Sequence, residues 1–182
     1  MHPWHDVYID EKLIAEACPV VIEVPKGSKN KYELDKETGL LKLDRVLYSA
    51  VHYPADYGFV PRSYCDDGDP LDALVLSQEP MVPLCLVEAR PVAVMRMRDD
   101  KGIDDKIICV NARDPYFEDV RDITDLSRHT LREMKRFFQD YKVLENKEVV
   151  VDDFLGLDDT LDVLRDALSL YRKLRRGELN RS

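Results

Sequence analysis

The order of the hydrophobic patterns along the chain constrains its fold more than any other feature. Short apolar or alternating segments dominate the first half, and prolines and glycines separate them as they separate β-strands. The expected strands are residues 20–24, 31–35, 40–45, 71–77, 84–97, 106–110 and 147–151. Residues 36–39, between the second and third strands, are typical of a hairpin turn. Many short strands followed by helices predict an α+β fold, and the close spacing of the strands indicates a small β-barrel.

Two segments nearer the C-terminus have the hydrophobic period of about 3.6 residues that marks amphipathic helices. The stripe of the first helix consists of Leu131, Met134, Phe137, Phe138, Tyr141 and Leu144. The stripe of the second consists of Leu161, Leu164, Leu168, Tyr171 and Leu174. Asp158 or Asp159 is suited to cap the second helix at its N-terminus, and Gly177 is expected to end it after a basic last turn. The sequence therefore predicts two main helices beside the barrel.

Length and charge narrow the function classes. The chain has 182 residues, which suits a single domain over residues 1–182. Its 36 acidic and 27 basic side chains give a net charge of −9, and such a surface repels nucleic acid and anionic lipid. We therefore expect no nucleic-acid partner and no membrane partner. An anionic substrate would need local cations to enter.

The cysteines and the N-terminus indicate the compartment. Cys18, Cys65, Cys85 and Cys109 form no CxxC pair and no zinc-finger spacing, so free thiols in a reducing compartment are expected. No apolar run approaches the roughly 18 residues of a membrane span. Residues 1–6 lack the pattern of a signal peptide. We expect a cytoplasmic protein.

An acidic cluster precedes the expected strand at residues 71–77. It places four carboxylates within seven residues, namely Asp66, Asp67, Asp69 and Asp72. Like charges this close raise one another's pKa unless cations neutralise them, and Mg²⁺ binds a few carboxylates while sharing its other positions with substrate phosphate. A solvated acidic turn is the alternative, because Asp-Gly and Asp-Pro are common turn dipeptides. A calcium EF-hand fits worse, since Leu74 falls where the bidentate Glu is needed.

A second acidic group lies at residues 99–106. Alone it is typical of a hairpin tip, and together with the first group it could complete a multi-metal site for phosphoryl transfer. Glu23 interrupts an apolar strand, where an unpaired carboxylate is costly. Lys31 and Glu33 share one face of their strand. These three residues form either a salt bridge on an edge strand or the wall of a polar cavity that contains cations.

Other basic and phenolic residues also have two interpretations. Arg45 could bind phosphate with two parallel donors or form a surface ion pair with Asp44 or another neighbour. Tyr57 could donate to a phosphate or pack at the barrel mouth. Tyr141 is expected in the helix core, and Lys142 on a solvated helix surface. No GxSxG, Walker A or GxGxxG motif is present, which disfavours serine hydrolases, P-loop NTPases and dinucleotide-binding enzymes.

The order of these segments resembles that of the family I soluble inorganic pyrophosphatases. The matching segments are 21–25 (VIEVP), 31–33 (KYE), 44–45 (DR), 53–58 (YPADYG), 67–72 (DGDPLD), Asp99, 104–106 (DDK) and 137–142 (FFQDYK). They occur in the family's order, and DGDPLD matches the family's most diagnostic motif at every position. Residues 1–20 and 150–182 match more loosely.

The resemblance implies a five-stranded, OB-like β-barrel flanked by helices, with the site at the barrel mouth. It implies that Asp67, Asp72 and Asp104 hold Mg²⁺, that Asp99 completes a further metal position, and that Glu23 and Glu33 contact metal through water. Asp69 is implied to be the general base or the group that orients the attacking water. The implied phosphate ligands are Lys31, Arg45, Tyr57, Lys106, Tyr141 and Lys142. Of these, Lys31, Arg45 and Tyr57 are expected to act in catalysis together with Asp69.

The implied activity is Mg²⁺-dependent hydrolysis of pyrophosphate to two orthophosphates by a metal-activated water. Several Mg²⁺ ions would bind per site, with Mn²⁺ or Zn²⁺ as substitutes. The resemblance also implies a homo-oligomer, a hexamer or a trimer. Arg136 and Asp140 stand where small bacterial-type members often carry histidines. The competing functions are a nucleotide or polyphosphate hydrolase, an OB-type module for single-stranded nucleic acid, and a passive metal-binding protein.

Overall fold

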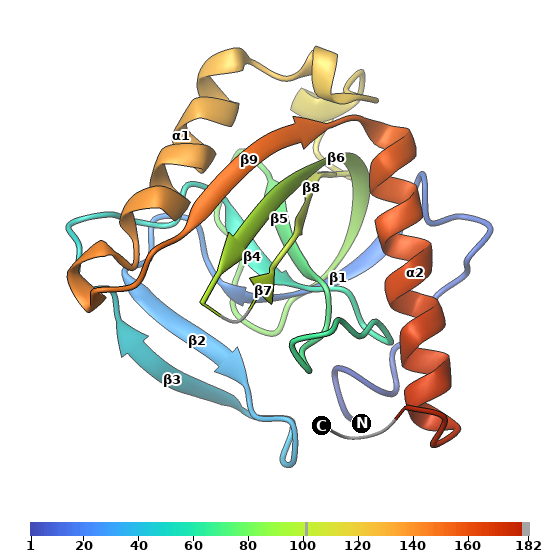
Figure 1. Ribbon diagram of the computed structural model, residues 1–182. Helices are drawn as coiled ribbons and strands as arrows, with labels where there is room; N and C mark the ends of the chain where they lie inside the picture. The colour runs from blue at the N-terminus through green and yellow to red at the C-terminus, as the bar shows by residue number, and fades with distance from the viewer. Residues whose placement is uncertain (101, 180–182) are drawn as a thin grey trace.

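Five strands of the protein close into a ring. The computed structural model describes residues 1–100 and 102–179. Strand β1 pairs with both β4 and β6, which closes the order β1–β4–β5–β8–β6 upon itself (Figure 1). The strands of the ring are β1 (Cys18–Val24), β4 (Asp56–Phe59), β5 (Asp72–Leu76), β6 (Leu86–Asp99) and β8 (Lys106–Asn111). Within the ring β5 and β8 are parallel and the other pairs antiparallel. The predicted α+β fold with a five-stranded, OB-like barrel is confirmed.

The remaining strands extend the barrel or stand apart from it. Strands β7 (Gly102–Ile103) and β9 (Val150–Leu155) both pair with β6. Strands β2 (Asn30–Leu34) and β3 (Leu41–Val46) form a separate two-stranded ribbon below the barrel in Figure 1. The expected hairpin across residues 36–39 is therefore confirmed. The last expected strand begins at residue 150 rather than 147.

The two main helices pack on different parts of the barrel (Figure 1). They are α1 (Arg128–Asp140) and α2 (Leu157–Arg175), and short 3₁₀ turns lie at η1 (Pro115–Phe117), η2 (Ile123–Asp125) and η3 (Val143–Glu145). The prediction of an Asp158 or Asp159 N-cap is wrong, because Gly156 is the cap residue and both aspartates lie in the first turn. The side chain of Asp122 instead accepts from the backbone N–H of Leu157 at 2.8 Å. Gly177 follows the last turn with φ +73°, as expected.

Strand side chains alternate between two hydrophobic clusters, as the two-residue period of a strand requires. On β5, Leu74 and Leu76 belong to the cluster that includes Phe137 and Phe138 of α1. The intervening residues Ala73 and Val75 belong to the cluster that includes Leu164 and Leu168 of α2. The barrel strands are thus buried on both faces, which explains why they are apolar runs rather than alternating segments.

Strand β4 was not among the expected strands. Its sequence contains a glycine, and prolines precede and follow it, features that disfavour a strand. The glycine is required by close packing, because a Cβ at Gly58 would lie 1.9 Å from the carbonyl oxygen of Val21 on β1. Gly58 therefore weakens the strand pattern of the sequence, and it also allows β4 to pack closely against β1.

All four cysteines are free thiols, two of them buried. Among residues 1–100 and 102–179, no helix has the length and apolar character of a membrane span.

Candidate active site

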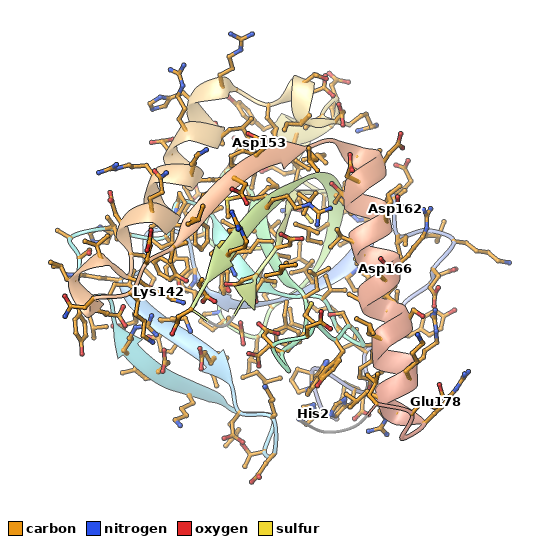
Figure 2. The ribbon with its side chains drawn as sticks, in the orientation of Figure 1. His2, Lys142, Asp153, Asp162, Asp166 and Glu178 are labelled. Atoms are coloured by element: carbon orange, nitrogen blue, oxygen red, sulfur yellow. The ribbon has the colours of Figure 1, made fainter. Side chains whose placement is uncertain are left out.

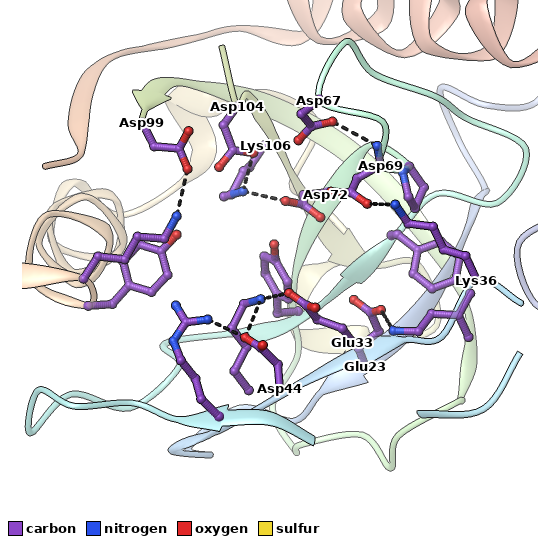
Figure 3. Close-up of a pocket in the computed structure, with 18 of the residues that line it drawn as sticks. Glu23, Glu33, Lys36, Asp44, Asp67, Asp69, Asp72, Asp99, Asp104 and Lys106 are labelled. Carbon is purple, nitrogen blue, oxygen red and sulfur yellow. Dashed lines mark hydrogen bonds and ion pairs between the residues drawn. The ribbon is translucent and has the colours of Figure 1, made fainter. Parts of the chain in front are cut away.

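One cavity of about 470 Å³ opens between the β2–β3 ribbon and the mouth of the barrel (Figure 3). All thirteen residues that the sequence singled out line it. They are Glu23, Lys31, Glu33, Arg45, Tyr57, Asp67, Asp69, Asp72, Asp99, Asp104, Lys106, Tyr141 and Lys142. These residues span 120 positions of sequence, and the fold places them around one space.

The parallel pair β5–β8 sets the floor of the cavity. Asp72 and Lys106 begin these strands and lie opposite each other in the register, so their side chains leave the sheet on the same face. The ammonium of Lys106 donates to Asp72 at 2.5 Å and to Asp104 at 2.9 Å. Two carboxylates thus share one lysine at the centre of the site.

Lys106 is almost fully buried, with 2% of its surface exposed. Its Nζ lies 5.6 Å from the ring centre of Tyr57 and 5.5 Å from that of Phe138, which are favourable contacts for a cation. Burial alone would lower the pKa of Lys106, but Asp72 and Asp104 outweigh it and hold that pKa above its usual value. A fixed positive charge therefore faces the cavity at neutral pH.

The acidic loop forms the wall beside β5. Its chain reverses at Gly68, whose φ is +87°. The backbone N–H of Asp69 donates to the carboxylate of Asp67 at 3.0 Å, and the carbonyl of Asp69 accepts from the N–H of Cys65 at 2.8 Å. Burial raises the pKa of Asp67. Burial also raises the pKa of Asp104 to about 6, against the pull of Lys106.

The β2–β3 ribbon forms the opposite wall. Lys31 and Arg45 are register partners, so both point to the same face. Lys31 forms an ion pair with Glu33, as their shared face predicts, and reaches Asp44 at 3.4 Å. Arg45 pairs with Asp44 and places Nε 3.0 Å from the carboxylate of Glu145 on η3. Two cations on this wall are therefore held by neighbouring carboxylates.

Glu23 connects the ribbon to the barrel. It lies on β1, and its carboxylate accepts from the backbone N–H of Leu34 on β2 at 2.6 Å. Burial raises the pKa of Glu23 to about 8, and the charge of Asp72 adds to the rise. The predicted salt bridge among the strand residues therefore joins Lys31 to Glu33, whereas Glu23 holds a backbone group.

The phenols and Lys142 complete the cavity. Burial raises the pKa of Tyr57 and of Tyr141, so both hydroxyls keep their protons and can donate. Helix α1 ends at Asp140, so Lys142 follows the helix instead of lying on its solvated surface. The Nζ of Lys142 donates to Asp99 at 2.8 Å. Figure 2 shows Lys142 near the β2–β3 ribbon. The helix end thus delivers a phenol and an ammonium to the site.

The sequence motifs assign no role to Glu145 or Lys36, whereas Asp44 is the ion-pair partner that the sequence offers Arg45 as an alternative to phosphate. Asp44 and Glu145 hold the guanidinium of Arg45. Lys36 lines the cavity and forms an ion pair with Asp69. Lys36 lies just beyond the matched segment 31–33, and that position was a usable signal for it. Glu145 lies 100 residues from Arg45 along the chain, and only the fold reveals it.

The cavity has the donor chemistry of a hard-cation site. Its acidic side chains offer only oxygen donors, and burial raises the pKa of Asp67 and of Asp104, so a bound cation would favour their charged forms. Within the described part of the chain, no three carboxylate, histidine or cysteine side chains converge closely enough to form a ready-made metal cluster. Lys106 instead stands between Asp72 and Asp104. The oxygen donors fit Mg²⁺, which takes few protein carboxylates and keeps several waters.

Comparison with known proteins agrees with this architecture. The soluble inorganic pyrophosphatase 2 of Chlamydomonas reinhardtii is 54% identical over 172 residues, which cover 94% of this chain and 89% of that protein. The soluble inorganic pyrophosphatase of Oryza sativa subsp. japonica is 52% identical over 170 residues, 93% of this chain and 79% of that protein.

Solved structures give the same result. The inorganic pyrophosphatase of Thermus thermophilus has a TM-score of 0.90 at 40% identity and covers 94% of this chain and 99% of its own. The inorganic pyrophosphatase of Helicobacter pylori has a TM-score of 0.87 at 46% identity. It covers 92% of this chain and 99% of its own. The family model described as inorganic pyrophosphatase matches residues 20–172, so the match continues beyond residue 150, where the sequence motifs were loose. The chain belongs to the inorganic pyrophosphatase family.

Proposed function

We propose that this protein hydrolyses inorganic pyrophosphate to two orthophosphates with Mg²⁺ as its cofactor. The observation that carries the proposal is the shared cavity, where metal-binding carboxylates face a set of cations and phenols. A carboxylate cluster alone would suit a passive metal site. The added donors suit an anionic substrate, and the membership of the chain in the pyrophosphatase family names that substrate.

In this proposal Asp67, Asp72 and Asp104 hold Mg²⁺, and Asp99 completes a further position. Glu23 and Glu33 support the metal through water. When bound, Mg²⁺ would lower the pKa of a coordinated water toward neutrality and neutralise phosphate charge. A bound cation would favour the charged forms of Asp67 and Asp104, whose pKa values are raised by burial.

Asp69 would orient the attacking water and accept its remaining proton. The carboxylate lies at the cavity edge, half exposed, on the loop that carries Asp67. It is therefore reachable by a water held at the neighbouring carboxylates. General base catalysis of this kind typically contributes about 10²- to 10⁴-fold to a rate.

The cations and phenols would stabilise charge on the phosphates. Lys31, Arg45 and Tyr57 would act on the reacting phosphoryl group, together with Lys106, Tyr141 and Lys142 as further ligands. Their partners hold them in place before substrate arrives, as at Lys106 and Arg45. Positioned charges of this type supply most of the catalysis in phosphoryl transfer.

The test is phosphate release from pyrophosphate with Mg²⁺ and with a chelator, using wild type, Asp69→Asn and Asp162→Asn. We expect release that requires Mg²⁺ and falls by about 10²- to 10⁴-fold in Asp69→Asn, since the amide cannot accept the proton. Asp162 is the matched control, because it lies exposed on α2 away from the cavity (Figure 2). No release from the folded protein with Mg²⁺, Mn²⁺ or Zn²⁺, or faster release from ATP than from pyrophosphate, would contradict the proposal.

We further propose that the protein is a cytoplasmic homo-oligomer, a hexamer or a trimer. The free thiols support a reducing compartment, and family membership supports the assembly. Light scattering on the eluting protein measures the mass directly. A mass near the monomer's 21.1 kDa would contradict the assembly.

A further inference from the structure

Lys36 joins the tip of the β2–β3 ribbon to the acidic loop (Figure 3). Its ammonium donates to the carbonyl of Gly68 at 3.0 Å and forms an ion pair with the carboxylate of Asp69. Both partners lie in the turn that separates Asp67 from Asp72. One side chain from the ribbon therefore contacts the backbone of the loop and the proposed general base together.

The turn that carries Lys36 is fixed by its own hydrogen bonds. Asp35 accepts from the N–H groups of Glu37 at 3.2 Å and Thr38 at 2.8 Å, and from the Thr38 hydroxyl at 2.7 Å. The N–H of Gly39 donates to the carbonyl of Asp35 at 2.8 Å. The backbone at Lys36 is thus held independently of the ion pair.

The N-terminal segment anchors this turn to the body of the protein. His2 Nε2 lies 3.1 Å from the carbonyl of Lys36, and a Cβ at Gly39 would lie 3.2 Å from His2. Trp4 donates from Nε1 to the carbonyl of Ser63 at 2.9 Å, and Figure 2 shows His2 beside the end of α2. The N-terminal segment therefore links the ribbon tip to the barrel.

We propose that Lys36 is a positioning residue that holds the Asp69 carboxylate where the attacking water needs it. The proposal rests on the function proposed above, because it assigns Asp69 to that water. Its two contacts fix both the peptide before Asp69 and the carboxylate itself, so the side chain has little freedom to rotate. A misplacement of about 1 Å can reduce a rate about 10²-fold, so this restraint matters for turnover.

The same ion pair contributes little to folding. The side chains of Lys36 and Asp69 are 45% and 41% exposed, and exposed pairs contribute little to stability. A loss of Lys36 should therefore appear in kcat and leave the unfolding midpoint nearly unchanged. A lower kcat with an unchanged unfolding midpoint would therefore indicate a positioning role, and a lower midpoint would indicate a structural one.

Direct binding of substrate is the competing role, since Lys36 lines the cavity. Removal of a phosphate ligand that acts equally on substrate and transition state raises KM and leaves kcat unchanged. Removal of a positioning group lowers kcat with KM nearly constant. The two roles are therefore separable by steady-state kinetics.

The experiment is a double-mutant cycle on pyrophosphate hydrolysis with Mg²⁺. The variants are Lys36→Met, Lys36→Arg, Asp69→Asn and the Lys36→Met/Asp69→Asn pair. We expect Lys36→Met to lower kcat about 10- to 100-fold with KM within about twofold, and Lys36→Arg to restore most of the rate. In the Asp69→Asn background Lys36→Met should have no further effect, since it acts through a group already removed. Lys42→Met, an exposed lysine on the same ribbon, is the matched control and should match wild type.

Each contrary outcome has a distinct meaning. If Asp69→Asn collapses activity and Lys36→Met lowers it further in that background, Lys36 does not act through Asp69 and this proposal is overturned alone. A raised KM with unchanged kcat, or kinetics equal to those of Lys42→Met, also overturns it. A fully active Asp69→Asn variant would overturn the assigned role of Asp69 and the role of Lys36 with it.

Discussion

At the scale of single residues, the site is organised by charges that are removed from water and paired. Lys106 keeps its charge because Asp72 and Asp104 lie within hydrogen-bond distance. Glu23 has a backbone partner but sits beside Asp72, and burial favours its neutral form. Such pairings cost stability unless the partners are well placed. Lys106 has two well-placed partners, whereas Glu23 is more stable in its neutral form.

Glu23 gives a pH-dependent prediction for stability. Its pKa is about 8 in the folded protein, above its usual value of 4.5, so the folded state binds the proton more tightly than the unfolded state. Its contribution is therefore complete below pH 4.5 and is lost as pH rises through 8. Glu23→Gln keeps an acceptor for Leu34 N–H and cannot ionise. We expect Glu23→Gln to gain stability over wild type as pH rises, on the order of a few kcal/mol by pH 8.

Urea unfolding of metal-free protein from pH 4.5 to 9 measures this difference. Glu79→Gln is the control, because Glu79 is an exposed carboxylate. Its unfolding free energy should run parallel to that of wild type. A Glu23→Gln curve that also runs parallel would show that Glu23 is ionised in the folded state.

At the scale of elements, two pairings build the cavity. The parallel pair β5–β8 places Asp72 opposite Lys106, and the ribbon β2–β3 places Lys31 opposite Arg45. Strand β4 connects β1 to β5 and brings Tyr57 into the same cavity. Strand register therefore decides which side chains meet, since a shift of one residue would turn each to the other face.

The β1–β4 pair depends on Gly58. A Cβ there would lie 1.9 Å from the carbonyl of Val21 and 2.8 Å from the Cα of Ile22, both backbone atoms that cannot rotate away. We expect Gly58→Ala to destabilise the protein by about 3 kcal/mol or more, at or above the upper end for overpacking. Urea unfolding measures the loss.

Gly177→Ala is the matched comparison for that substitution. Gly177 has φ +73° and no atom near its virtual Cβ, so an alanine there meets only backbone strain. Its cost should be about 1–2 kcal/mol. Equal losses in the two variants would show that β1 and β4 can separate without penalty.

At the scale of the whole molecule, the helices and the barrel share their cores. Strand β6 contributes Met95 to the cluster under α1 and Val94 to the cluster under α2. The N-terminal segment joins a third cluster, in which Trp4 packs with Phe59 and Tyr171. Among residues 1–100 and 102–179, helices and barrel strands share these clusters, so loss of one helix would expose apolar surface of the barrel.

This sharing predicts that the single-domain interpretation will hold in solution. We expect metal-free protein to unfold in one cooperative urea transition, the same by Trp4 fluorescence and by far-UV circular dichroism. Trp4 is the only tryptophan, so its emission reports the N-terminal cluster. A fluorescence transition at lower urea than the dichroism transition would mean that this segment unfolds separately.

The sequence alone determined much of the site. The DGDPLD segment and the ordered motifs from residue 21 to 142 identified thirteen residues that the fold gathers around one cavity. Periodicity located both main helices and most strands, because burial of one face or stripe imposes a pattern on the chain. It missed β4, because Gly58 disfavours a strand in the sequence and is needed for close packing against β1.

Only the tertiary structure decided which polar groups from distant segments of the chain meet. Lys36 with Asp69, Glu145 with Arg45 and Asp122 with the start of α2 are contacts between segments distant in sequence. Hydrophobic periodicity predicts which side of a helix or strand is buried. It does not predict which residue of another segment lies across a cavity. The partners are fixed by strand register and by the way the ribbon and helices pack on the barrel. The sequence therefore predicted most of the residues that line the site, and the fold determined which of them contact one another.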